Sequence, residues 1–170
     1  AGYCRLTQNV NGLVGSILYN QPFQTGFFVE FDYLPGGGSG ADGLALNFFK
    51  EAYVPAPGGQ LGSVDADGTS LGYSVEFDNY DNGAADPSAN HIAITQNNFL
   101  NHIISVNDPR TEDNTWHHAK VFVFSRGITV YVDDMENSLL SWGMLVDMTY
   151  GGLSFSAGTG GLNNNQFVDN

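Results

Sequence analysis

The segment from residue 76 to residue 91 carries side chains that bind metal ions in proteins: Glu76, Asp78, Asn82, Asp86 and His91. Glu76 and Asp78 lie two residues apart in a run that alternates apolar and polar residues. A strand there would point both carboxylates to one face. A return strand beginning at His91 would bring its imidazole to the same face. Burial of these carboxylates is costly without a compensating cation, so the sequence predicts one or two metal ions here.

The donor atoms of this segment divide into two overlapping sets. The first set offers only oxygen atoms, which suits Ca²⁺: Asp78, the backbone carbonyl near Tyr80, Asn82 and Asp86. The second set includes one nitrogen, which suits Mn²⁺, Zn²⁺ or another first-row metal: Glu76, Asp78, Asp86 and His91. Asp78 and Asp86 would bridge the two ions. The alternative is an acidic, asparagine-rich turn that binds no metal.

Short strands are predicted to position this segment, because the composition is that of an all-β protein. The 170 residues include 22 glycines, 12 phenylalanines and 8 tyrosines, which favours many strands and tight turns. Residues 139–148 fit a helix and a strand, and the choice stays open. Alternating runs predict strands over 3–7, 14–19, 27–33, 44–49 and 153–157, and a hairpin of 116–124 with 127–133. We expect one domain spanning residues 1–170.

Charge and hydropathy narrow the classes of function. The formal net charge is −13, which disfavours binding to nucleic acid or to an anionic membrane surface. No apolar run approaches the length of a membrane span, so no membrane insertion is expected. Cys4 is the only cysteine, which leaves no intrachain disulfide and no assigned role for this thiol.

The spacing Glu76-Phe-Asp78-x-Tyr80-x-Asn82, then Asp86-Pro, then His91-Ile-x-Ile resembles the metal-binding segment of L-type (legume-type) lectins. The resemblance implies a two-sheet antiparallel β-sandwich, the concanavalin A-like jelly roll. In that family a calcium ion and a transition-metal ion hold a carbohydrate-binding loop in shape. For this chain, the resemblance implies manganese-type ligands Glu76, Asp78, Asp86 and His91. It also implies calcium ligands Asp78, Tyr80 (carbonyl), Asn82 and Asp86.

Two loops resemble the first and second sugar loops of these lectins. Ala41-Asp42-Gly43 looks like the first loop, in which the aspartate follows a cis peptide bond and accepts hydrogen bonds from two sugar hydroxyls. Gly59, in the run 58–62, matches a glycine whose amide donates to the sugar. An aromatic residue is common in the family where Gln60 stands, so the resemblance does not define the sugar specificity.

The metal segment and the C-terminal part complete the implied sugar site. Tyr80 would offer an aromatic face to the sugar ring, and Asn82 would bind calcium and a sugar hydroxyl. The run from Phe155 to Ala157 resembles the strand before the fourth, variable sugar loop. In that loop Asn163 and Asn164 carry amides suited to hydroxyl-rich ligands.

The resemblance implies a calcium-dependent, non-enzymatic lectin domain that binds a glycan or glycoprotein, outside the cell or at its surface, in adhesion or glycan recognition. Lectin domains of this family have a further strand before the region of Leu6-Thr7 and another after the position of Val168-Asp169, side by side in the back sheet. We expect both to be missing from this chain, which would leave an open sheet edge for self-association. A fragment of a longer protein, or a neighbouring subunit that completes the sheet, would explain this.

Two other functions compete with the lectin hypothesis. A structural subunit of an extracellular filament or surface assembly would keep the fold without using the sugar site. A glycoside hydrolase would need a pair of carboxylates on one face, but strand alternation puts Tyr80 rather than Asp81 on the face of Glu76 and Asp78. The neighbouring His117 and His118 would point to opposite faces of a strand, so we expect structural or exposed roles for them.

Overall fold

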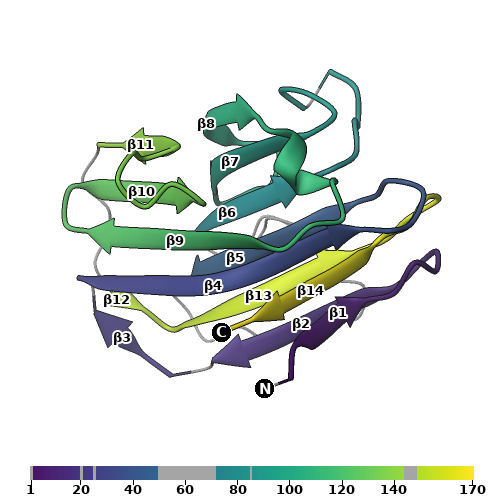
Figure 1. Cartoon of the computed structure of the whole chain (residues 1–170). Helices are drawn as coiled ribbons and strands as arrows, with labels where there is room; N and C mark the ends of the chain where they lie inside the picture. Colours follow the sequence, from purple (N-terminus) through teal and green to yellow (C-terminus); the bar gives the residue numbers. More distant parts are fainter. Residues whose placement is uncertain (1, 20, 25, 50–71, 85, 144–148) are drawn as a thin grey trace.

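Two six-stranded antiparallel sheets face each other in the computed structural model, which describes residues 2–19, 21–24, 26–49, 72–84, 86–143 and 149–170 (Figure 1). The back sheet consists, in spatial order, of β1 (Cys4–Thr7), β14 (Asn165–Asp169), β4 (Phe27–Gly36), β9 (His117–Phe124), β10 (Gly127–Val132) and β11 (Leu140–Trp142). The front sheet consists of β2 (Val14–Tyr19), β13 (Gly152–Gly158), β5 (Gly43–Phe49), β6 (Gly72–Asp78), β7 (His91–Gln96) and β8 (His102–Asn107).

Three short elements accompany the sheets in the described part of the chain: β3 (Phe23–Gln24), which pairs with β12 (Thr149–Tyr150), and the 3₁₀ turn η1 (Pro109–Thr111). The predicted all-β sandwich is therefore confirmed. Residues 139–148 fitted both a helix and a strand in the sequence. Their first part forms strand β11, paired with β10, and residues 144–148 lie outside the described part. No helix among the described residues is long and apolar enough to cross a membrane.

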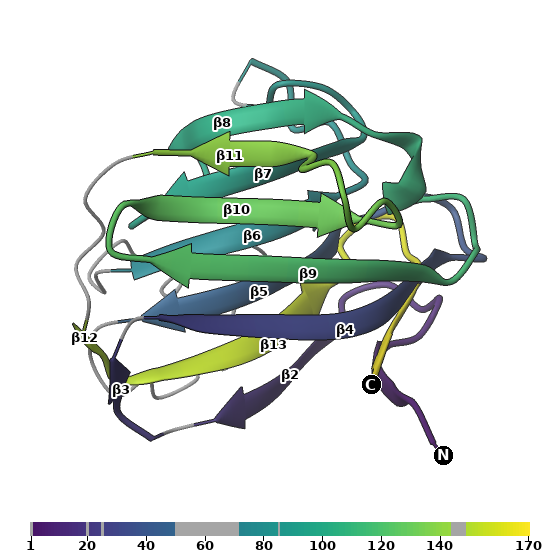
Figure 2. The same ribbon diagram turned by 60° about the vertical axis from the view of Figure 1, so that its left-hand side comes forward.

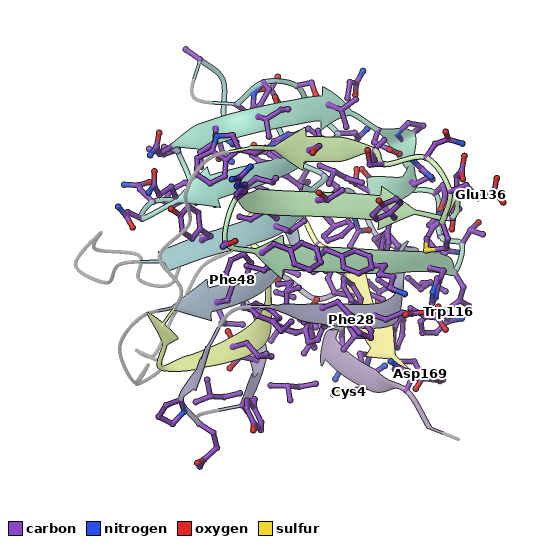
Figure 3. All side chains as sticks on the ribbon, turned by 90° about the vertical axis from the view of Figure 1, so that its left-hand side faces the viewer. Cys4, Phe28, Phe48, Trp116, Glu136 and Asp169 are labelled. Atoms are coloured by element: carbon purple, nitrogen blue, oxygen red, sulfur yellow. The ribbon has the colours of Figure 1, made fainter. Side chains whose placement is uncertain are left out.

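Strand alternation explains how the sequence builds the sandwich. In β4, Phe27, Val29 and Phe31 pack toward the front sheet, whereas Phe28 is exposed on the outer face of the back sheet (Figure 3). The core between the sheets is formed by apolar side chains that are almost inaccessible to solvent. Removal of such side chains from water stabilises the fold by about 1.5–3 kcal/mol each. Examples are Phe31, Tyr33, Leu46, Phe77, Ile92, Val121 and Val130.

The loops that matter for function gather at one end of the sandwich. The β4–β5, β6–β7 and β13–β14 connections all turn at the right-hand end in Figure 1. Figure 2 shows the N and C termini close together at one side of the molecule, where β1 pairs with β14 and Cys4 lies opposite Val168. The outermost strands are β1 and β11 in the back sheet and β2 and β8 in the front sheet.

Candidate functional site

Strands β6 and β7 carry the polar face that the sequence predicts. Asp78 lies directly opposite His91 in the antiparallel register, and Glu76 lies opposite Ala93. Directly opposed residues share a face of the sheet, so Glu76, Asp78 and His91 point to the same side. Phe77, between the two carboxylates, points into the core. The structure brings Glu76 and His91 into contact, with 3.2 Å between Oε1 and Nε2.

The orientation of His91 suits a metal ligand. Its Nδ1 lies 2.8 Å from the carbonyl oxygen of Ser88, which assigns the ring proton to Nδ1 as the donor in this bond. Nε2 then directs a lone pair at the carboxylate of Glu76, and two acceptors need a cation or a proton between them. His91 is fully buried and Glu76 is 2% exposed, so water does not screen this contact.

Asp78 adds a second buried carboxylate to this face. Its Oδ1 accepts a hydrogen bond of 2.7 Å from the amide of Tyr80. Burial raises the pKa of Asp78 to about 8, although that hydrogen bond opposes the shift. In the metal-free protein the anionic form is thus disfavoured at neutral pH, whereas a bound divalent cation would favour it. Glu76, Asp78 and His91 therefore fit a metal ion both in donor type and in charge.

The loop after β6 holds the other predicted metal ligands near the surface. Oδ2 of Asp86 accepts a hydrogen bond of 2.5 Å from the amide of Asn82. Asn82 and Tyr80 are exposed, Tyr80 by 37%. Among the described residues, the set of carboxylate and imidazole atoms within 4.8 Å of one another does not include Asp78 or Asp86. The predicted ligands thus lie at the end of β6, at the start of β7 and in the loop between them, but the structure does not bring either predicted set together completely.

His102 is a member of this site that the sequence interpretation did not include. Its Nε2 lies 2.7 Å from Oε1 of Glu76, and Glu76, His91 and His102 form the one group of candidate metal ligands found in the described part of the chain. The spacing of His102 from His91 in the sequence does not indicate that the two side chains share a face. They do so because the pairing of β8 with β7 is irregular.

Asp42 lies in the β4–β5 connection and is fixed by its backbone. Its amide donates to the carbonyl of Gly158 at 3.0 Å, and its carbonyl accepts from the amide of Asn79 at 3.1 Å. The Ala41–Asp42 peptide bond is cis, as the resemblance implies. Gly43 follows at a φ of +132°, and a Cβ there would lie 2.3 Å from the carbonyl oxygen of Phe77. Only glycine fits this position, so the local backbone geometry explains why a glycine follows Asp42.

The carboxylate of Asp42 faces the β13–β14 loop. A Cβ on Gly160 would lie 3.3 Å and 3.4 Å from its two oxygens, so the glycine leaves open the space beside them. Partial burial raises the pKa of Asp42 above its ordinary value. Gly160 is a second site residue that the sequence interpretation did not single out, although its place just after β13 is in the loop predicted to contact sugar.

The two asparagines of that loop that were predicted to contact sugar differ in their exposure to solvent. Asn164 is fully buried: its Oδ1 accepts from the amide of Gly38 at 3.0 Å, and its Nδ2 donates to Glu112 at 3.2 Å. This side chain therefore shapes the loop and presents no surface to a ligand. Asn163 is partly exposed, and its carbonyl accepts from the amide of Ser39 at 2.7 Å. Gly59 lies outside the described residues.

The two adjacent histidines point to opposite faces of β9, as expected. His117 is buried and contacts Asp113 and Asp133, each at 2.9 Å. His118 lies on the outer face of the back sheet, 2.7 Å from Asp32 and 3.1 Å from Glu30. The carboxylate of Asp81, considered for a hydrolase, is exposed and accepts a hydrogen bond from the amide of Gly83 at 2.7 Å.

Several solved structures resemble this chain over 98% of its length. The exoplasmic/lumenal domain of VIP36, in a form with Ca²⁺ and Man2 bound, gives a TM-score of 0.75 at 20% identity and is covered over 73%. The seed lectin (isoform) of Lotus tetragonolobus gives 0.76 at 16% identity, and the lectin UEA-II complexed with galactose gives 0.70 at 19%; each is covered over 84%. No family model and no curated protein matches the sequence. The chain has the fold of the legume-type lectins.

Proposed function

We propose that this chain, which has the legume-lectin fold, is a calcium-dependent carbohydrate-binding domain without enzymatic activity. The observation that carries the proposal is the position of Asp42. Its carboxylate faces Gly160, and its backbone is tied both to Gly158 and to Asn79 at the start of the metal loop. A carboxylate held in this way offers two acceptors to neighbouring sugar hydroxyls without covalent chemistry.

We expect the other contacts that a sugar needs to come from the metal loop and from the β13–β14 loop. The exposed ring of Tyr80 offers an apolar face. The exposed Asn82 carries an amide that can bind a hydroxyl while its oxygen contacts calcium. Asn163 lies at the loop facing Asp42, and Gly59 is proposed as a further amide donor. The similar solved structures that contain a mannose-containing glycan or galactose support a glycan or glycoprotein as partner.

Two metal ions are part of this proposal. Calcium would be held by Asp78, the carbonyl of Tyr80, Asn82 and Asp86. A transition-metal ion would be held by Glu76, His91 and the two shared aspartates. The ions would draw the loop carboxylates away from the backbone amides that they accept from, and so would set the shape of the loop beside Asp42. Recognition of glycans outside the cell or at its surface, as in adhesion, fits this chemistry.

The test is glycan-array binding of the full chain before chelation, after chelation and after restoration of calcium. Binding that disappears with EDTA and returns with calcium supports the proposal. Asp42→Asn should abolish binding with no change in folding, because it removes an acceptor oxygen. Asp81→Asn, the same substitution at an exposed carboxylate of the neighbouring loop, should leave binding intact. Binding that survives both chelation and Asp42→Asn would overturn the proposal.

A second candidate function, self-assembly, is favoured by the outer edge of β2. This strand pairs with β13 and forms the margin of the front sheet. It exposes three large apolar side chains, with Val14 48%, Ile17 41% and Tyr19 54% accessible. An apolar edge strand is a template for pairing with another chain. Light scattering of the purified chain would test whether assembly persists after chelation and after Asp42→Asn.

A further inference from the structure

One carboxylate oxygen lies between two imidazole nitrogens on the polar face of the front sheet. Oε1 of Glu76 is 3.2 Å from Nε2 of His91 and 2.7 Å from Nε2 of His102. The two rings have centroids 5.2 Å apart at 72°, so they meet edge to face and do not stack. The side chain of His102 is only 11% exposed. The three donor atoms therefore converge in a place that bulk water hardly reaches.

A β-bulge is the reason that His102 reaches this face. Ile94 pairs with Ile104, but the next residue of β7, Thr95, pairs with His102, so Ile103 is skipped. A regular ladder would place Ile103 opposite Thr95 and turn His102 to the core face. The irregularity instead puts His102 on the face of Thr95, which is also the face of the metal ligands. A bulge that re-aims a side chain in this way is typical of a functional position.

We propose that His102 is a further protein ligand of the transition-metal ion, beside Glu76 and His91, and that its imidazole strengthens the preference of the site for Zn²⁺ over Mn²⁺. Imidazole nitrogen suits zinc, copper and nickel, whereas carboxylate, carbonyl and water oxygens suit manganese. Two imidazoles with one carboxylate are a common three-ligand zinc set. The inference rests on the metal site of the proposed function, but it does not depend on sugar binding.

The metal-free contacts are those expected of such a site. Nε2 of His91 faces the oxygen of Glu76 with a lone pair, because its Nδ1 donates to Ser88, and Nε2 of His102 faces the same oxygen. One divalent ion among these atoms would satisfy both nitrogens and the buried oxygen at once. Asp78, which shares this face, is available as a further carboxylate.

The test is isothermal titration of the chelator-stripped full chain with Zn²⁺ and with Mn²⁺, at constant calcium. The wild type should bind Zn²⁺ more tightly than Mn²⁺, and by a larger factor than His102→Ala does, because sites of this kind favour Zn²⁺ over Mn²⁺ even without a second imidazole. His102→Ala should weaken Zn²⁺ binding by roughly ten- to hundred-fold or more and weaken Mn²⁺ binding less. His118→Ala is the matched control, because His118 also contacts two carboxylates, at 2.7 Å and 3.1 Å, but on the back sheet. It should retain the wild-type affinity for both ions.

A second measurement avoids the risk that His102→Ala misfolds. In the wild type, long-range ¹H–¹⁵N spectra should show the Nε2 resonance of His102 shifting to that of a zinc-bound nitrogen when one equivalent of Zn²⁺ is added. The proposal is overturned if this resonance does not move at saturation, or if folded His102→Ala binds Zn²⁺ as the wild type does.

The glycan assay separates this inference from the proposed function. Zinc bound through His102 in a chain that binds no glycan would sustain the inference and overturn the lectin proposal. Calcium-dependent glycan binding, together with a zinc affinity that does not change in His102→Ala, would sustain the lectin proposal and overturn this inference.

Discussion

The amide of Asn79 donates to the carbonyl oxygen of Asp42 at 3.1 Å, so the candidate sugar loop is joined directly to the end of the strand that carries the metal ligands. The side chain of Asn79 is buried, and its Nδ2 donates to the carbonyl of Thr111 at 3.1 Å. Three segments far apart in the chain thus meet at Asn79. A change in the metal loop can reach Asp42 through this one residue.

We expect Asn79→Ala to weaken glycan binding and to lower the free energy of unfolding by about 1 to 3 kcal/mol, because the carbonyl of Thr111 loses its buried donor. Urea unfolding and glycan titration measure the two effects. Asn98→Ala, at a surface turn where Oδ1 accepts from the amide of Leu100, is the control and should leave glycan affinity unchanged. Equal glycan affinity in Asn79→Ala and the wild type would show that the side chain of Asn79, which contacts Thr111, does not support the sugar loop.

Gly160→Ala should lower glycan affinity by roughly tenfold, equivalent to about 1.4 kcal/mol, because the new methyl group would lie beside both oxygens of Asp42. Gly161→Ala is a close control, since a Cβ there meets no atom within 4 Å. Titration with the best glycan from the array compares the two variants. If both lose affinity equally, crowding of Asp42 is not the cause.

Metal removal should lower the unfolding temperature. Metal present at about 100 times its dissociation constant stabilises the folded state by about 2.7 kcal/mol, and chelation removes this contribution. Glu76→Gln should abolish the stabilisation by Zn²⁺ but retain a response to calcium. Glu136→Gln, at an exposed glutamate (Figure 3), should respond to both ions as the wild type does. Thermal scans that are the same with and without chelator would count against the metal site.

His118 should make a small contribution to stability that is greater in acid. Its hydrogen bond with Asp32, helped by Glu30, outweighs desolvation and raises the pKa of His118 above its ordinary 6.5. A raised folded-state pKa gives stability that is fully present below the unfolded value and is lost as pH rises through the folded value. His118→Ala should therefore destabilise more at about pH 5.5 than at about pH 8.5. Urea unfolding at both pH values checks this, and an equal difference would contradict it.

Ile17→Lys should reduce any self-association, because a charge on an exposed edge strand opposes pairing with another strand. Light scattering across a range of protein concentrations measures the effect. Val10→Lys is the control: Val10 is 51% exposed but lies outside the strands. Assembly that both variants lower equally would point to net charge and not to the edge of β2.

The sequence predicted the sandwich and most of its strands, because alternation of apolar residues reports directly on which face is buried. The run of β2 matches its predicted bounds, and Glu76 and His91 meet as expected. The contribution of His102 depends on a bulge, which leaves no periodic signal. The burial of Asn164 depends on packing by Gly38 and Glu112, which are distant in the chain. Local patterns thus predict strands and motifs, whereas long-range packing decides which polar side chains reach the surface.

The strand order also constrains how the chain can fold as it is synthesised. β14 lies between β1 and β4, and β13 lies between β2 and β5. Each sheet therefore separates two early strands by one that leaves the ribosome late. Until residues 152–169 emerge, β1, β2, β4 and β5 each lack a neighbouring strand, and Asp42 lacks the carbonyl of Gly158 that its amide contacts. The nascent chain would carry unpaired edges through most of its synthesis, so its assembly is expected to be slow, late and sensitive to chaperones.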